Sequence, residues 1–133
     1  MANAKNVRVK PVELNINGKL YTLKYDFNAF IELEEIYGSI DEALAKLQGE
    51  VILDKDGKPI IIQDKDGKDI EKRNISFKAL RDFLWSGLLY GNENITKKEV
   101  AHMLEFSNFS DIADKMIEAI KASLPEKVDD VKN

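Results

Sequence analysis

The sequence predicts a mainly α protein of the α+β class, with an N-terminal β-hairpin, about five helices and a short β-ribbon insertion at about 50–73. Apolar and polar residues alternate on both sides of an Asn-Gly pair near the N-terminus, which is typical of a hairpin. Apolar residues then recur with helical spacing in later segments, and two DKDGK loops interrupt them. The 133 residues are the size of one domain, which we place at 1–125, and we expect 126–133 to be a disordered tail.

The hairpin is predicted from residues 12–25, which read VELNINGKLYTLKY. Asn17-Gly18 suits a type I′ turn, because both central residues of that turn need a positive φ. We therefore expect strands near 12–16 and 19–25.

The first two helices are predicted from FNAFIELEEIYG and SIDEALAKLQG. Gly38 is a plausible end for the first helix, and Gly49 closes the second. Ser39 and Glu42 have the spacing of a capping box at the start of the second helix. The apolar face expected for the first helix comprises Phe27, Phe30, Ile31, Leu33 and Ile36.

Three further helices follow the insertion. Ser76 is expected to cap FKALRDFLWSGLLYG, and Thr96 with Glu99 forms a capping box that opens KKEVAHMLEF. Ser110 is expected to cap DIADKMIEAIKASL, which Pro125 ends. The expected apolar stripe of this last helix comprises Ile112, Ala113, Met116, Ile117, Ile120 and Leu124.

The two DKDGK loops raise the question of a calcium site. An EF-hand loop needs oxygen ligands at positions 1, 3 and 5, Gly at position 6 and a bidentate Glu at position 12. Placing Gly57 or Gly67 at position 6 puts isoleucine at position 1 and Gln63 or Arg73 at position 12. Both registers lack two ligands, so we predict no metal site.

Two tight turns explain the same residues better. Asp at the first position of a turn bonds back to its own backbone, and Gly completes the loop in the left-handed region. We therefore predict three short strands, near 51–53, 59–63 and 69–72, joined by these turns.

Composition excludes several classes of protein. The formal net charge of −4 and a sequence pI of about 5.1 disfavour binding to nucleic acid. The absence of cysteine excludes a disulfide scaffold and a cysteine nucleophile. No apolar run approaches the ~20 residues that span a bilayer, and the N-terminus lacks the apolar stretch of a signal peptide. We expect a soluble intracellular protein that binds neither nucleic acid nor membranes.

No set of residues indicates catalysis. His102 is the only histidine, and Glu32, Glu34 and Glu35 are expected on or beside the solvated face of a helix. TKKEVAHMLEFSNFSDIADKM has the length of a helix-turn-helix, but that motif would bury Asp111 and Asp114. We predict no catalytic residue, no cofactor and no metal ligand, and therefore no enzyme.

The third helix is apolar on nearly all sides. Lys78 and Asp82 mark its polar side, and the residues expected on its apolar side are Phe77, Leu80, Phe83, Leu84, Gly87 and Leu88. Trp85 and Leu89 fall within about 40° of Lys78, in the middle of its polar sector. Two interpretations remain open: burial under a neighbouring element, or an exposed contact that serves a partner. For the second interpretation, the predicted partner surface is Trp85, Leu89 and Tyr90.

Two long segments carry a resemblance to a known family. ELNINGKLYTLKYDFNAFIELEEIYGSIDEAL (13–44) and ISFKALRDFLWSGLLYGNENITKKEVAHMLE (75–105), followed by the amphipathic last helix, resemble the tail assembly chaperones of long-tailed bacteriophages. The resemblance implies a non-enzymatic, largely helical protein of the host bacterial cytoplasm. Its implied partners are the tape measure protein, which it keeps soluble, and tail tube subunits, which it helps to recruit.

The resemblance has limits. The family has no fixed site motif, so it implies no functional residue, and the insertion at 50–73 departs from the family pattern. A structural tail or connector protein retained in the virion is the main alternative, and a small regulatory or ligand-sensing domain is a more remote one. A homo-oligomer is compatible with the sequence.

Overall fold

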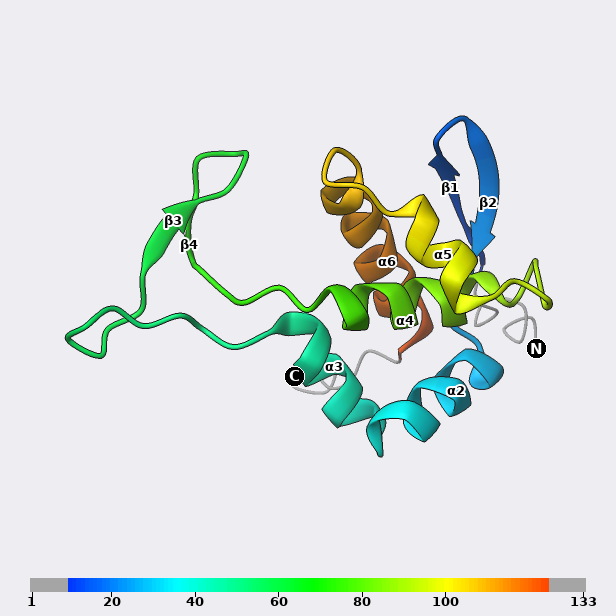
Figure 1. Ribbon diagram of the computed structural model, residues 1–133, viewed down its shortest axis with the longest axis horizontal. Helices are drawn as coiled ribbons and strands as arrows, with labels where there is room; N and C mark the ends of the chain where they lie inside the picture. The colour runs from blue at the N-terminus through cyan, green and yellow to red at the C-terminus, as the bar shows by residue number, and fades with distance from the viewer. Residues whose placement is uncertain (1–9, 125–133) are drawn as a thin grey trace, which may run out of the picture.

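The computed structural model describes residues 10–124, so the tail expected at 126–133 lies outside the described part. Its elements are β1 (Val12–Ile16), β2 (Lys19–Leu23), α2 (Phe27–Tyr37), α3 (Ile40–Gln48), β3 (Ile61–Gln63), β4 (Asp69–Glu71), α4 (Phe77–Leu88), α5 (Lys97–Met103) and α6 (Phe109–Ser123). The helices and the β1–β2 hairpin form a body, and an arm that carries β3 and β4 projects from one end of it (Figure 1). The predicted class is confirmed.

The N-terminal hairpin forms as predicted. β1 and β2 are antiparallel, and Asn17 (φ 53°) and Gly18 (φ 87°) both adopt the positive φ that a type I′ turn requires. Leu14 and Ile16 of β1 and Leu23 of β2 are buried against the helices. The second strand ends at Leu23, two residues earlier than expected.

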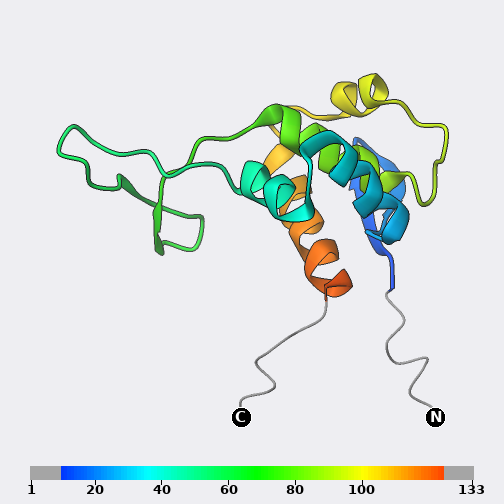
Figure 2. The same ribbon diagram turned by 90° about the horizontal axis from the view of Figure 1, so that it is seen from below.

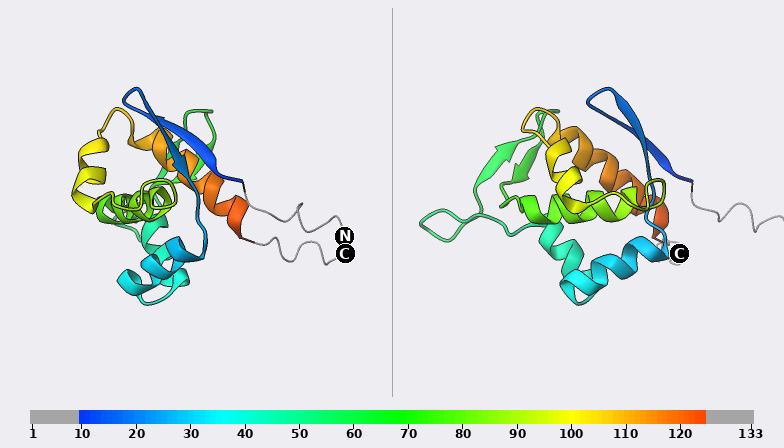
Figure 3. Two further views of the ribbon diagram at one scale, coloured as in Figure 1. Left: turned by 90° about the vertical axis from the view of Figure 1, so that its right-hand side faces the viewer. Right: turned by 45° about the vertical axis from the view of Figure 1, so that its right-hand side comes forward.

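α4 is the central helix of the body. Eight of its twelve residues are buried, and the left view of Figure 3 looks nearly along it, with the hairpin and the other helices arranged around it. Gly87 allows the hairpin to approach closely, because a Cβ there would lie 2.6 Å from the Leu23 side chain and 2.8 Å from the Tyr25 ring. The Tyr25 hydroxyl in turn donates to the Phe83 carbonyl at 2.7 Å.

The core is continuous from the hairpin to α6 and excludes the insertion. Each helix of the body contributes to it, and among the described residues no buried apolar side chain lies between Ala43 and Ala79. The buried cluster comprises Leu14, Ile16, Leu23, Tyr25, Ala29, Leu33, Ala43, Leu80, Phe83, Leu84, Leu88, Val100, Ile112, Met116, Ala119 and Ile120.

Parts of the predicted apolar faces were wrong. Phe27 and Ile31 of α2 are exposed, and so are Ile117 of α6 and Leu124, the C-cap of that helix. α2 packs mainly against α3 and α4, so only a narrow stripe, with Ala29 and Leu33 at its centre, becomes buried. Helical spacing shows which residues share a face, but the width of the buried stripe depends on the neighbouring elements.

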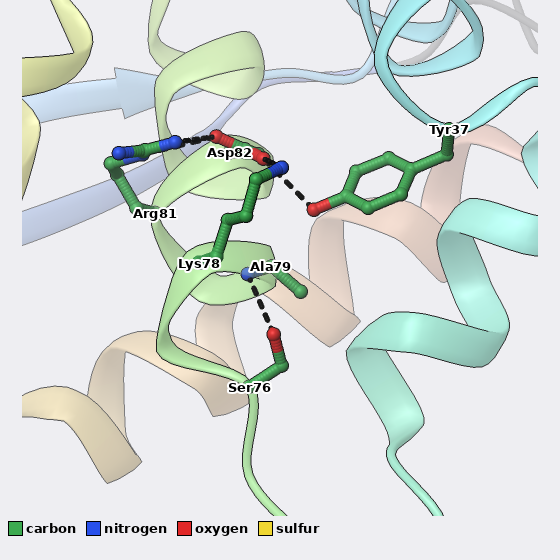
Figure 4. A network of polar contacts seen from close by, with 6 residues as sticks. All are labelled: Tyr37, Ser76, Lys78, Ala79, Arg81 and Asp82. Atoms are coloured by element: carbon green, nitrogen blue, oxygen red, sulfur yellow. Dashed lines mark hydrogen bonds and ion pairs between the residues drawn. The ribbon is translucent and has the colours of Figure 1, made fainter.

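The predicted caps are confirmed at three helices. The Ser39 and Ser76 hydroxyls accept from the amides of Glu42 and Ala79, and Thr96 forms a reciprocal capping box with Glu99. At Ser39 the structure has only this serine half of the predicted capping box. Figure 4 shows the contact of Ser76 with Ala79.

The ends of the last three helices differ from the prediction. α4 ends at Leu88 and α5 at Met103, both earlier than expected. α6 begins at Phe109 with Asn108 as its N-cap, so the predicted cap at Ser110 was wrong. The Asn108 side chain accepts from the Glu105 amide at 2.8 Å and donates to the Met103 carbonyl at 3.0 Å. These bonds close the linker between α5 and α6.

Both DKDGK loops are tight turns, as predicted. In the first, the Asp54 carboxylate accepts from the amides of Asp56 and Lys58, and Gly57 has φ 80°. The second turn repeats these bonds from Asp64. Since the Asp54 and Asp64 carboxylates are engaged by their own turns, these two residues serve chain reversal.

The strands of the arm meet in a three-way junction. The Ile52 amide donates to the Lys72 carbonyl at 2.8 Å, and the Lys72 amide donates to the Ile60 carbonyl at 2.8 Å. The Ile60 amide donates to the Ile52 carbonyl at 3.0 Å, which completes the ring. A neck and two short hairpins diverge from this ring of backbone bonds (Figure 2). No continuous strand forms at the predicted position 51–53. Val51 forms an isolated bridge with Arg73, and Leu53 forms one with Pro59.

The arm joins the body through a narrow neck. The Asn74 amide donates to the Glu50 carbonyl at 2.9 Å, and the Arg73 guanidinium donates to the Gly49 carbonyl at 3.0 Å. An ion pair at 3.2 Å between Lys65 of the second turn and Asp114 of α6 adds an exposed tie. Large aliphatic residues remain exposed along the arm: Leu53, Ile61, Ile62 and Ile70.

Candidate partner-binding site

The structure places the three residues of the predicted partner surface around the end of α4. Trp85 is half-buried, and its indole N–H donates to the Ile95 carbonyl at 3.0 Å. The Lys97 ammonium group lies 4.9 Å from the centroid of its ring. Trp85 therefore holds the loop between α4 and α5 against the body.

The other two residues follow Trp85 in the chain. Leu89 is half-buried, whereas Tyr90 is 49% exposed, with the Lys24 ammonium group 4.8 Å from its ring centroid. Tyr90 thus offers the largest accessible aromatic surface of the three. Their role in partner binding stays a prediction.

A second aromatic surface lies at the opposite end of α4. Phe77, Phe106 and Phe109 pack edge to face, with ring centroids 5.8 to 6.1 Å apart. We call them the phenylalanine cluster. Phe106 is 83% exposed and Phe77 is 54% exposed. Aromatic rings clustered at a surface and left accessible to water are typical of binding sites.

An apolar groove of about 450 Å³ adjoins the phenylalanine cluster. α4 forms one wall, and α5 with the 104–108 linker forms the other. Its lining residues are Phe77, Lys78, Leu80, Arg81, Ala101, Leu104, Glu105, Phe106 and Phe109. The two cations and Glu105 supply the charge at its rim.

The cations of the groove are held by a buried carboxylate (Figure 4). Asp82 is fully buried and accepts from the Lys78 ammonium group at 2.9 Å and from the Arg81 guanidinium at 2.8 and 3.0 Å. The Tyr37 hydroxyl of α2 donates to the same carboxylate at 2.8 Å. Asp82 therefore orients both cations and links α2 to α4.

This network shifts the pKa of its members. Burial acts to raise the pKa of Asp82, but the hydrogen bonds from Lys78, Arg81 and Tyr37 outweigh burial and lower it. Burial and the hydrogen bond to Asp82 raise the pKa of the Tyr37 hydroxyl. At neutral pH the network is thus a carboxylate with two cationic donors and one neutral donor.

Sequence reasoning missed the phenylalanine cluster. Phe77 was assigned to the apolar side of its helix, and Phe106 fell inside a helix that ends earlier than expected. The stretch Phe106-Ser-Asn-Phe109, with two aromatic residues in a short polar linker, is a signal that could have revealed it.

The groups weighed for chemistry lie apart on the surface. His102 is exposed on α5, and Glu34 and Glu35 are exposed on α2. Within residues 10–124, no three His, Cys, Asp or Glu residues come close enough to hold a metal ion. Among the helices of the same range, none has the length and apolarity to cross a bilayer.

Comparisons with family models, with curated proteins and with solved structures found no match to this chain. The fold and the groove define a small α+β protein with an exposed aromatic surface at one end of its central helix. Functional inference therefore starts from that surface and from the resemblance of segments 13–44 and 75–105.

Proposed function

We propose that this chain is a non-catalytic tail assembly chaperone of a long-tailed bacteriophage that acts in the host bacterial cytoplasm. It masks the apolar seam of the tape measure protein and helps to recruit tail tube subunits, which then displace it. The observation that supports this proposal best is the phenylalanine cluster beside an apolar groove, on a chain whose segments resemble that family.

The size of the groove fits reversible masking. At about 450 Å³ it accommodates a short segment of a partner. A chaperone that must leave again needs modest contacts at each copy, and many copies along a long partner multiply their effect. A small groove repeated on many chains satisfies both requirements.

Co-expression tests the proposal. The chain is produced together with the tape measure protein of the same phage or prophage, and the soluble fraction is compared with that of the tape measure protein alone. We expect the tape measure protein to become soluble and to co-purify with this chain. If it stays insoluble, the proposal is wrong.

Analysis of purified virions separates the proposal from its alternative. A chaperone is released before the particle is complete, so mass spectrometry of virions should find no stoichiometric amount of this chain. A stoichiometric amount would instead identify a structural tail or connector protein.

A further inference from the structure

We infer that the groove beside the phenylalanine cluster binds one α-helix of the partner, whose apolar stripe has acidic residues on one flank and basic residues on the other. This inference rests on the proposed function and assigns the chaperone's docking site. Three properties of the groove support it: its backbone, its apolar lining and the charges at its rim.

The backbone of the groove favours a helical occupant over an extended one. Three of the five linker amides are already used: Leu104 N–H donates to the Ala101 carbonyl at 3.3 Å, Glu105 N–H to the Asn108 side chain at 2.8 Å and Asn108 N–H to the Glu105 carbonyl at 3.0 Å. The opposite wall is α4, whose backbone groups bond within the helix. An extended peptide would therefore find few partners for its backbone groups, whereas a helix satisfies its own.

The lining matches an apolar stripe. Leu80, Ala101 and Leu104 lie in the groove, and the exposed ring of Phe106 stands at its edge. Covering these side chains removes apolar surface from water, which provides most of the driving force for docking. A helix offers such surface as residues spaced at i, i+3, i+4 and i+7.

The charges at the rim differ between the two walls. On the α4 wall, Lys78 and Arg81 share the one carboxylate of Asp82, which leaves one positive charge in excess. On the linker wall, Glu105 is exposed and accepts a 3.4 Å bond from the Ser107 hydroxyl. A helix with an acidic flank toward α4 and a basic flank toward Glu105 complements both, as flanking charges do in coiled coils.

Three designed helical peptides test the inference. Each is about 20 residues long with the same leucine stripe. The first has one acidic and one basic flank, the second two acidic flanks and the third two basic flanks. Binding is measured by fluorescence anisotropy of the labelled peptide. We expect the mixed peptide to bind about two- to fivefold more tightly than either of the others.

Phe106→Ser tests the location. We expect it to weaken binding of the mixed peptide about tenfold or more, because Phe106 is the exposed anchor of the groove. Phe27→Ser is the matched control, since both phenylalanines are 83% exposed and Phe27 lies on α2. Equal binding by the two variants would overturn the inference.

A charge reversal tests the orientation of the flanks. Glu105→Lys makes both walls positive, so the peptide with two acidic flanks should become the tightest binder. An unchanged order would overturn the assignment of the flanks.

Two further outcomes separate this inference from the proposed function. If Phe106→Ser still makes the tape measure protein soluble, the docking site is wrong and the chaperone function stands. If the peptides bind as expected but the tape measure protein stays insoluble, the docking site stands and the chaperone function fails. A wild-type dimer that Phe106→Ser dissociates in sedimentation would show that a second copy occupies the groove, which would overturn the inference.

Discussion

Asp82 shows how one buried carboxylate can organise both the interior and the surface. Its two oxygens accept four hydrogen bonds, from Tyr37 on α2 and from Lys78 and Arg81 on α4. A buried carboxylate is costly unless its partners satisfy it, and here they do. The same bonds set the positions of the cations at the groove, so the stability of α4 and the charge of the site depend on one residue.

Asp82→Asn should lower the free energy of unfolding by about 2–3 kcal/mol at neutral pH, because it removes the buried charge that two cations share. Urea unfolding measures the change, and Asp56→Asn, at an exposed turn, is a control expected to change it little. A loss no larger than that of the control would show that the network is not stabilising.

The stability difference between wild type and Asp82→Asn should depend on pH. The pKa of Asp82 lies below its ordinary value of 3.8, so the carboxylate contributes stability above that value and loses the contribution as pH falls through its lowered pKa. The difference in unfolding free energy between wild type and Asp82→Asn should therefore be constant from about pH 5 to 7 and shrink below about pH 4. A difference that grows in acid would contradict the assigned charge state.

Among the elements, α2 and α3 both end at a glycine with positive φ, but for different reasons. At Gly38 (φ 97°) nothing lies within 4 Å of the position that a Cβ would occupy. At Gly49 (φ 79°) a Cβ would clash with the Asn74 carbonyl oxygen. Gly38 is thus needed for its backbone conformation alone, whereas Gly49 also allows the two strands of the neck to meet.

Alanine at the two positions should separate these effects. Gly38→Ala should lower the free energy of unfolding by about 1 kcal/mol, because alanine is strained in the left-handed region. Gly49→Ala should lower it by about 1–3 kcal/mol more, because the Asn74 backbone must also move. Urea unfolding gives the free energies, and amide hydrogen exchange at Asn74 should accelerate in Gly49→Ala alone. Equal effects of the two substitutions would show that the neck has room for a side chain.

In the molecule as a whole, the body and the arm are stabilised in different ways. The body has one buried core around α4, while the arm depends on two Asp-Gly turns, a ring of backbone bonds and its neck. Since none of the buried apolar side chains found in residues 10–124 belongs to the arm, the body should not need it to fold.

Deleting the arm tests this division. Val51 and Arg73 face each other across the neck, so an Asn-Gly turn can join them in place of residues 52–72. We expect cooperative unfolding with Tm changed by less than about 5 °C, which corresponds to roughly 1 kcal/mol. Circular dichroism measures it. Deleting residues 12–23, which supply core side chains, should instead abolish folding. Loss of cooperativity in the arm deletion would contradict the division.

Local chemistry made much of the fold predictable. Asn17-Gly18, the serine and threonine caps and the two Asp-Gly turns act within a few residues of themselves, so the pattern of neighbouring residues is enough to place them. For the same reason the hairpin, the starts of three helices and the turns of the arm were predicted correctly. Ser110 failed because Asn108, two positions earlier, bonds across the linker to Met103 and Glu105.

The candidate site could not be predicted from neighbouring residues in the sequence. Helical spacing placed Phe77 on an apolar face, but its exposure depends on how far α5 and the linker cover that face. Helical spacing placed Asp82 on the polar side of its helix, but in the fold α2 covers it and Tyr37 donates a hydrogen bond to it. Periodicity orders residues around a single element, whereas burial, exposure and grooves arise between elements, from contacts that are distant along the chain.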